Sequence, residues 1–199
     1  MSDSAPRNPE HSVSEIFPNR WSPRSYTGEA IPDAILMRIF EAARWAPSAS
    51  NAQPWRFIVA KRETPDFERF LDLLVDRNRA WACKAAALVA LVSKRTKTMP
   101  GASEETPNRA HSLDAGAAWA HLALEASIVG WPAHGMLGLD IERLRSELGI
   151  PDDHHFEMLI AIGRRGDREA LPETYRAAEM PNGRLPVSDI VRFGVFGSV

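Results

Sequence analysis

Apolar residues recur along the chain at two different spacings, which predict a mixture of helices and strands. The clearest helical face, with intervals of three and four residues, consists of Ile35, Leu36, Ile39, Phe40 and Ala43. Pro32 and Asp33 come just before it, and both residue types favour the first turn of a helix. Pro47 ends this predicted helix because the residue before a proline avoids helical backbone angles.

The same reasoning predicts the remaining elements of a single folded domain. Short apolar runs without helical spacing predict core strands over residues 55–60, 86–92 and 156–163. Helical spacing, together with proline and glycine stop signals, predicts helices over residues 13–17, 67–74, 112–129 and 141–148. We expect Pro18 to stop the first of these helices.

Two polar stretches show no periodicity. Residues 1–12 contain two prolines and predict a disordered N-terminal arm before a domain that spans residues 13–199. Residues 94–111 carry Pro100, Gly101 and Pro107, and this pattern predicts a flexible excursion between core elements.

Composition narrows the class of protein. The chain has 199 residues, 44% of them hydrophobic, and its 24 basic and 26 acidic side chains give a net charge of −2. This balance predicts no nucleic-acid or membrane partner, and the absence of a leader pattern favours the cytoplasm. Cys83 is the only cysteine, and the adjacent His154 and His155 lack further ligands at metal spacing, so we predict no metal site.

The loop between the predicted helix at 33–46 and the strand at 55–60 is the strongest candidate for a site. Pro47 and Pro54 bracket small polar residues, among them Ser48, Ser50 and Asn51. Their short side chains bond easily to the backbone or to a ligand, and the prolines keep the loop stiff. Such a loop could hold a flat polar cofactor, although an ordinary helix-to-strand connection explains the composition equally well.

Two further stretches carry candidate binding groups. Arg20 and Arg24 flank Ser22 and could converge on one anion, since guanidinium groups match phosphate geometry. Arginines beside a helix end are also commonly just solvated. Gly135 and Gly138 would let a ligand approach the backbone closely, whereas the neighbouring His134 is more simply read as a structural residue.

The predicted helix at 112–129 has a face of small residues, which would let another backbone pack closely against it. This face consists of Gly116, Ala120, Ala123 and Ser127. Glycine within a helix costs about 1 kcal/mol relative to alanine, so a packing reason is expected. Packing within the same subunit and packing against a second copy are both open.

Taken together, these motifs resemble the nitroreductase family, the FMN-dependent NAD(P)H oxidoreductases. The match rests on Arg20-x-Ser22-x-Arg24, on the Ala-Pro-Ser-x-x-Asn-x-Gln-Pro-Trp loop, on Asn78, on residues 135–140 and on Arg184-Leu-Pro, in the family's order. The resemblance implies an α+β fold with a mixed, largely antiparallel sheet flanked by helices. It also implies an interlocked homodimer whose C-terminal arms embrace the partner.

The resemblance assigns FMN-binding roles to fourteen positions. They are Arg20, Trp21, Ser22, Arg24, Pro47, Ser48, Ala49, Asn51, Asn78, Gly135, Met136, Leu137, Gly138 and Arg184. In the family the arginines hold the FMN phosphate, and the backbone of the glycine segment reaches the edge of the flavin ring. The loop that begins at Pro47 would come mainly from the partner subunit, and the other residues from one subunit.

The implied activity is transfer of hydride from NAD(P)H, through bound FMN, to a small oxidant such as a nitroaromatic or a quinone, in a ping-pong mechanism. Because the flavin carries the chemistry, no catalytic side chain is predicted. Three alternatives stay open: a flavin-fragmenting relative that forms dimethylbenzimidazole, a dehalogenating relative, and a flavin-binding sensor or carrier without turnover.

Overall fold

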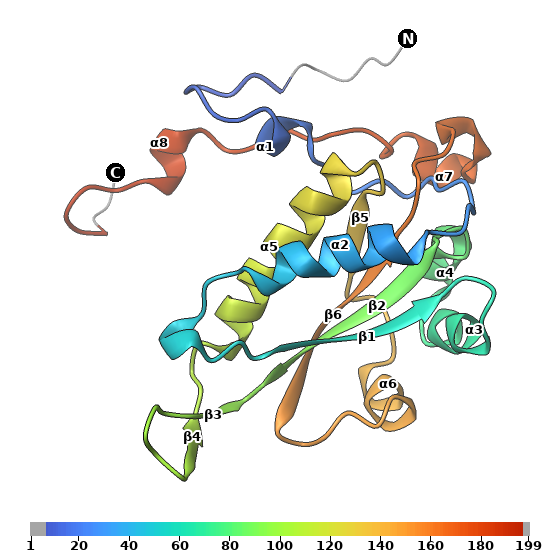
Figure 1. Cartoon of the computed structure of the whole chain (residues 1–199). Helices are drawn as coiled ribbons and strands as arrows, with labels where there is room; N and C mark the ends of the chain where they lie inside the picture. The colour runs from blue at the N-terminus through green and yellow to red at the C-terminus, as the bar shows by residue number, and fades with distance from the viewer. Residues whose placement is uncertain (1–6, 197–199) are drawn as a thin grey trace.

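A four-stranded antiparallel sheet lies between two layers of helices (Figure 1). The computed structural model describes residues 7–196. The strand order is β1 (Trp55–Lys61), β2 (Ala87–Lys94), β6 (His154–Ile162) and β5 (Ala133–Met136). Each neighbouring pair is antiparallel, and no parallel pair occurs in the described part of the chain. The expected α+β class with a largely antiparallel sheet is confirmed.

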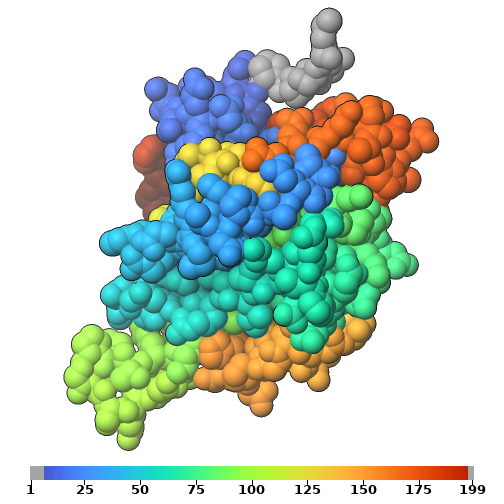
Figure 2. Space-filling model, turned by 45° about the vertical axis from the view of Figure 1, so that its right-hand side comes forward, coloured from blue at the N-terminus to red at the C-terminus, as the bar shows by residue number. Residues whose placement is uncertain are grey.

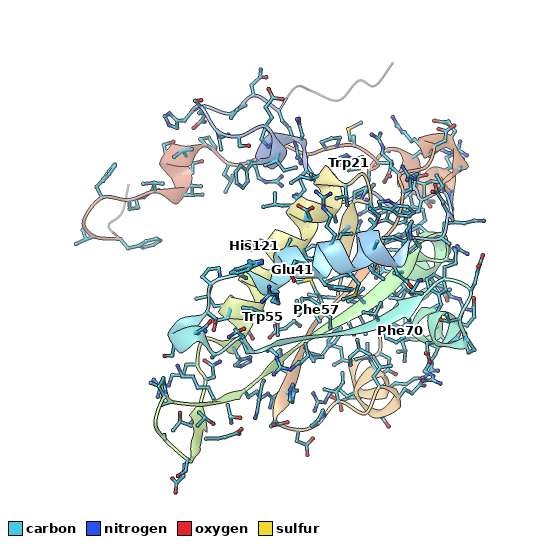
Figure 3. The ribbon with its side chains drawn as sticks, viewed as in Figure 1. Trp21, Glu41, Trp55, Phe57, Phe70 and His121 are labelled. Carbon is cyan, nitrogen blue, oxygen red and sulfur yellow. The ribbon has the colours of Figure 1, made fainter. Side chains whose placement is uncertain are left out.

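Helices α2 (Asp33–Arg44) and α5 (His111–Ile128) cover one face of the sheet. Val89 and Leu91 of β2 point into this layer, and Phe57 of β1 packs against the helix side as well (Figure 3). Side chains alternate between the two faces of a strand, so every second residue of β2 contributes to this core. Burying a valine or leucine side chain stabilises the fold by about 1.5–3 kcal/mol.

Helices α3 (Pro65–Asp72), α4 (Asp76–Ala82) and α6 (Ile141–Glu147) cover the other face. The intervening residues of β2, including Leu88 and Ala90, point into this second core. Because β2 is buried on both faces, its sequence is an uninterrupted apolar run rather than an alternating one.

The segment expected to be a flexible excursion is a hairpin, and that expectation was wrong. β3 (Thr96–Thr98) pairs with β4 (Glu105–Pro107), and Gly101 in the connecting turn has a φ of +80°. Lys94 and Glu105 form an ion pair across the base of the hairpin. The hairpin projects from the body of the molecule (Figures 1 and 2).

The first helix also differs from the expectation. α1 (Ile16–Asn19) begins three residues later than predicted and contains Pro18 instead of ending before it. A proline in the first turn is tolerated because the backbone N–H that it lacks has no partner within the helix there.

The N-terminal end of the described chain lies near α1, and the C-terminal end lies beyond α8, toward the left of the view (Figure 1). Residues 7–12 have no helix or strand, and the first six residues of the predicted arm lie outside the described residues. The C-terminal arm carries three short helical turns: η2 (Arg168–Ala170), α7 (Glu173–Arg176) and α8 (Val187–Ile190). Between residues 7 and 196, no helix is long and apolar enough to cross a membrane.

Candidate functional site

The segment that follows α1 is held by a buried carboxylate from the C-terminal arm. Both carboxylate oxygens of Glu179, which is 4% exposed, accept from the backbone N–H of Arg24 at 2.9 and 3.0 Å. Nη1 of Arg20 donates to Oγ of Ser22 at 3.4 Å, and the Arg165 guanidinium lies 5.1 Å from the centre of the Trp21 ring. The backbone is thereby fixed while the polar side chains of Arg20 and Ser22 stay together.

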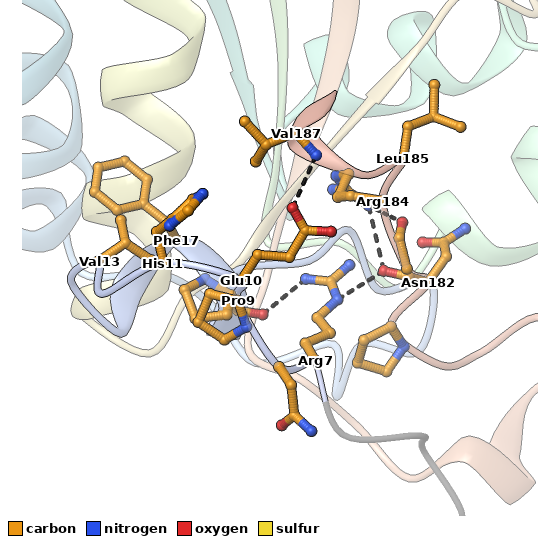
Figure 4. A pocket seen from close by; sticks show the side chains of 14 residues that line it. Arg7, Pro9, Glu10, His11, Val13, Phe17, Asn182, Arg184, Leu185 and Val187 are labelled. Carbon is orange, nitrogen blue, oxygen red and sulfur yellow. Dashed lines mark hydrogen bonds between the residues drawn. The ribbon is translucent and has the colours of Figure 1, made fainter. Parts of the chain in front are cut away.

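Arg7 and Arg184 lie where the N-terminal and C-terminal segments meet (Figure 4), and Arg20 is near enough for its charge to interact with theirs. Burial, followed by the nearby Arg184 charge, lowers the pKa of Arg20, and the same causes together with Arg20 lower the pKa of Arg7. Within residues 7–196, none of the three forms an ion pair with a carboxylate. Like charges held together without a counter-charge favour binding of an anion, and guanidinium forks suit phosphate.

Arg7 was missed by the sequence reasoning, which set residues 1–12 aside as an arm. Its Nε donates to the carbonyl oxygen of Asn182 at 2.8 Å, and its Nη1 donates to those of Pro18 and Arg20 at 2.9 and 2.8 Å. No local pattern marks this arginine, because its partners are distant in sequence. The division into an arm and a domain stays a prediction.

Asn78 and the glycine segment after β5 lie together. Nδ2 of Asn78 donates to the carbonyl oxygen of Gly138 at 3.1 Å, and the backbone N–H of Val75 donates to the same oxygen at 3.2 Å. A Cβ at Gly138 would lie 2.7 Å from Nδ2 of Asn78, so any larger residue there requires the Asn78 side chain to shift. Leu137 is 64% exposed, whereas Met136 is buried in the core and could serve a ligand only through its backbone.

His134 connects these pieces. Its Nδ1 lies 3.0 Å from the carbonyl oxygen of Pro23, and its ring packs 4.7 Å from that of Trp81, one turn after Asn78 on α4. Burial lowers the pKa of His134 to about 4, which keeps the ring neutral near pH 7. The neutral ring therefore fixes the Ser22–Arg24 segment against β5 and α4, in keeping with a structural role.

The proline-bracketed loop contains the short turn η1 (Ala49–Asn51) and is anchored to the start of α5. The backbone N–H of Ala49 donates to Oδ2 of the buried Asp114 at 3.2 Å, and that of Gln53 donates to Oγ of Ser48 at 3.0 Å. Residues with positive φ, between 45° and 56°, are Ser50, Asn51 and Gln53. Pro47 is exposed at the entry to the loop. Such backbone strain is uncommon for residues other than glycine and clusters at functional sites.

The fourteen predicted residues thus form two groups on one chain. The Pro47–Asn51 loop lies beside the first turn of α5, whereas β5 begins only after the last turn of that helix. At about 1.5 Å per residue, the 18 residues of α5 span roughly 27 Å. Figure 1 shows the loop near β3 and β4, away from α1 and α4. A single chain does not bring the two groups together.

One face of α5 is apolar and uncovered. Leu113 and Ile128 are 78% and 57% exposed, and Gly116 and Ala120 between them are exposed as well. A Cβ added at Gly116 would meet nothing within 4 Å. Ala123, which was expected on the same small-residue face, is buried within its own chain.

Comparisons with known proteins identify the family of this chain. The family model described as "Nitroreductase family" matches residues 18–80 and 68–164. The chain belongs to the nitroreductase family. A protein of Streptomyces coelicolor with the provisional name NADH dehydrogenase/NAD(P)H nitroreductase is 31% identical over 82% of this chain and 90% of its own length. The NADH dehydrogenase of Thermus thermophilus is 28% identical over 86% of this chain and 91% of its own length.

Solved structures of nitroreductases and related proteins share the fold. An oxidoreductase described as containing FMN has a TM-score of 0.93 and 39% identity, with 100% of both chains covered. A provisionally named nitroreductase from Desulfovibrio desulfuricans, solved in complex with FMN, has a TM-score of 0.72 and 24% identity over 92% of this chain and 96% of its own. Within residues 7–196, this member of the family has no cluster of His, Cys, Asp or Glu that could hold a metal ion.

Proposed function

We propose that this protein is an FMN-dependent oxidoreductase that takes hydride from NAD(P)H and reduces small oxidants such as nitroaromatics or quinones. The observation that carries the proposal is the group of arginines Arg7, Arg20 and Arg184, which form no ion pair within residues 7–196. The Asn78–Gly138 contact adds a second candidate binding surface on the same chain. A phosphate monoester at the arginines and a flat polar ring near the glycine segment would satisfy both features. The names of the family relatives, which include NADH dehydrogenase and NAD(P)H nitroreductase, support the same activity.

The residues present fit FMN in chemical character. Arg20 and Arg184 would hold the phosphate, and Ser22 would add a hydroxyl donor. Gly138 leaves room for Asn78 because it has no Cβ. When bound, FMN supplies the redox chemistry, in two half-reactions that alternate between NAD(P)H and the oxidant. The chain contributes binding and orientation, and no side chain acts as a nucleophile.

We further propose that the active form is a homodimer in which the Pro47–Asn51 loop of one protomer completes the site of the other. The Pro47–Asn51 loop and the other predicted flavin residues are separated along α5, and this separation supports the arrangement. Within one chain, each of the two groups forms only part of a flavin site. The exposed apolar face of α5 offers a surface for the second copy. Obligate dimers bury more than roughly 2,000 Å², which a helix face and the C-terminal arm could supply together.

The decisive experiment uses purified full-length protein. We expect it to be yellow, to release FMN on denaturation, and to lose its visible flavin absorbance on anaerobic addition of NADH or NADPH. Addition of menadione or nitrofurazone should then restore the absorbance. A flavin that is reduced by neither nicotinamide, or that cannot pass its electrons on, would show a carrier or sensor instead of this enzyme.

A further inference from the structure

The N-terminal segment carries an arginine, Arg7, that contacts both the segment of Arg20 and the segment just before Arg184. We propose that Arg7 is a positioning residue that ties the segment carrying Arg20 to the arm carrying Arg184, so that both guanidinium groups face one phosphate. This inference rests on the proposed function, and it concerns a residue outside the motifs by which the sequence resembles the family.

The contacts of Arg7 join two segments that are remote in sequence. Nη1 of Arg7 donates to the carbonyl oxygens of Pro18 and Arg20. Nε of Arg7 donates to the carbonyl oxygen of Asn182, two residues before Arg184. Arg7 and Asn182 are 175 positions apart. All three acceptors are neutral carbonyl groups, so Arg7 crosslinks the segments without cancelling its own charge or theirs.

A second contact holds the same two segments in register. The backbone N–H of Val187 donates to Oε2 of Glu10 at 2.9 Å. Between this contact and Arg7 lies a cavity of about 610 Å³, lined by Arg7 and Arg184 and by apolar side chains that include Phe17 (Figure 4). The Glu10 carboxylate lines the cavity too, but within the described residues it forms no ion pair with these arginines.

The arginines need such a crosslink because their charges repel one another. Without an anion, Arg20 and Arg184 would tend to move apart, and both are attached to segments outside the sheet. Three hydrogen bonds from Arg7 oppose this separation in advance of binding. A site that is organised before its ligand arrives binds more tightly, because less ordering remains to be done on binding.

The test compares FMN with riboflavin, which has the same ring and ribityl chain but no phosphate. Each flavin is titrated into full-length apoprotein, and its affinity is measured from quenching of flavin fluorescence. The ratio of the two affinities reports on the phosphate end alone. The variants are Arg7→Gln, Arg7→Lys and, as a matched control, Arg62→Gln. Arg62 also donates to two backbone carbonyls, of Ala85 and Cys83, and forms no ion pair in the described chain, but its partners lie in neither of the two segments that Arg7 joins.

We expect Arg7→Gln to lower the preference for FMN over riboflavin roughly tenfold while riboflavin affinity stays within about twofold. Arg7→Lys keeps the charge but lacks the planar fork that reaches both segments, so it should recover less than half of this loss on a logarithmic scale. Arg62→Gln should lower thermal stability and leave the preference unchanged.

Each other result has a definite meaning. An unchanged preference in Arg7→Gln, or full recovery in Arg7→Lys, would overturn the positioning role while the proposed function stands. Wild-type apoprotein that binds neither flavin would overturn the proposed function and this inference with it. Circular dichroism checks that each variant is folded. If Arg7→Gln does not fold, Arg7→Lys decides the question: the positioning role requires that it lower the preference for FMN over riboflavin at least threefold.

Discussion

Asn78 occupies the space that a Cβ at Gly138 would enter. The distance from an added Cβ to Nδ2 of Asn78 would be 2.7 Å, shorter than atoms of this kind tolerate. At the scale of single residues, the proposed site therefore depends on a Cβ that is absent at Gly138 and on ion pairs that Arg20 and Arg184 do not form within residues 7–196.

Gly138→Ala should displace the Asn78 side chain and weaken FMN binding about tenfold, since one well-placed hydrogen bond contributes on that order. The measurement is FMN affinity of the variant, of Asn78→Ala and of the double variant. If the clash with Asn78 is the cause, the two effects will not add, because the second change removes a contact already lost. Additive losses would show that Gly138 acts independently of Asn78.

His134 predicts an acid-sensitive contribution to stability. Its pKa is about 4 in the folded chain, lowered by burial and also by the charges of Arg24 and Arg20, against 6.5 when unfolded. Protons therefore bind the unfolded chain preferentially, so stability is complete above about pH 6.5 and falls as the pH drops toward 4. Between about pH 7 and about pH 5 the loss should be at most about 2 kcal/mol.

The variant His134→Phe keeps an aromatic ring against Trp81 but cannot take up a proton. It should be less stable than the wild type near pH 7, because the bond to the Pro23 carbonyl is lost, and the difference should narrow as the pH falls. Urea unfolding at both pH values measures this. Parallel pH profiles for the two proteins would contradict the assignment.

At the scale of elements, the long helices and core strands were predictable and the short polar elements were not. α2 and α5 show clear helical spacing with proline and glycine boundaries, and β2 is an apolar run because both its faces are buried. α4 was missed because only Trp81 and Ala82 of its seven residues are buried. The β3–β4 hairpin was missed because its strands are polar and none of their residues is buried.

The exposed face of α5 leads to a prediction about assembly. Gly116→Leu or Ala120→Leu should hold the helices of two protomers apart, so that dimer and flavin are lost together. Sedimentation velocity, read beside flavin absorbance, measures both. Ser146→Leu is a matched control, because Ser146 is an exposed small residue on α6. A stable monomer that keeps FMN and reduces menadione would contradict the proposal that each flavin site is built from two protomers.

At the scale of the whole molecule, the resemblance supplied both the candidate residues and their expected division between two subunits, and the structure adds how far apart the two groups lie on one chain. The loop at Pro47 and the segment at Arg20 lie at opposite ends of α5, a separation that linear order does not reveal. Arg7 could not be found from sequence because its role arises from contacts across 175 positions. Local patterns predict elements; they do not predict contacts between the two ends of a chain.

Division of the site predicts complementation between two defective chains. One chain carries Arg20→Ala and Arg184→Ala; the other carries Asn51→Pro, which cannot adopt the native φ of 53°. Each should lose flavin when expressed alone. Co-expression should restore about one flavin per mixed dimer, because one of its two sites then has only wild-type residues. If mixed dimers form and bind no flavin, both groups serve a site within one chain.

The hydrogen bonds between Arg7 and Asn182, and between Glu10 and Val187, set an order of events during synthesis. Arg20 leaves the ribosome early, but its crosslinked partner segment is among the last to be translated. Closing a loop of this length costs conformational entropy, and no favourable contact offsets this cost until the two segments meet. Under the proposed function, only a nearly complete chain can capture the cofactor, because a nascent chain that stops before Asn182 lacks both Arg184 and the contact between Arg7 and Asn182.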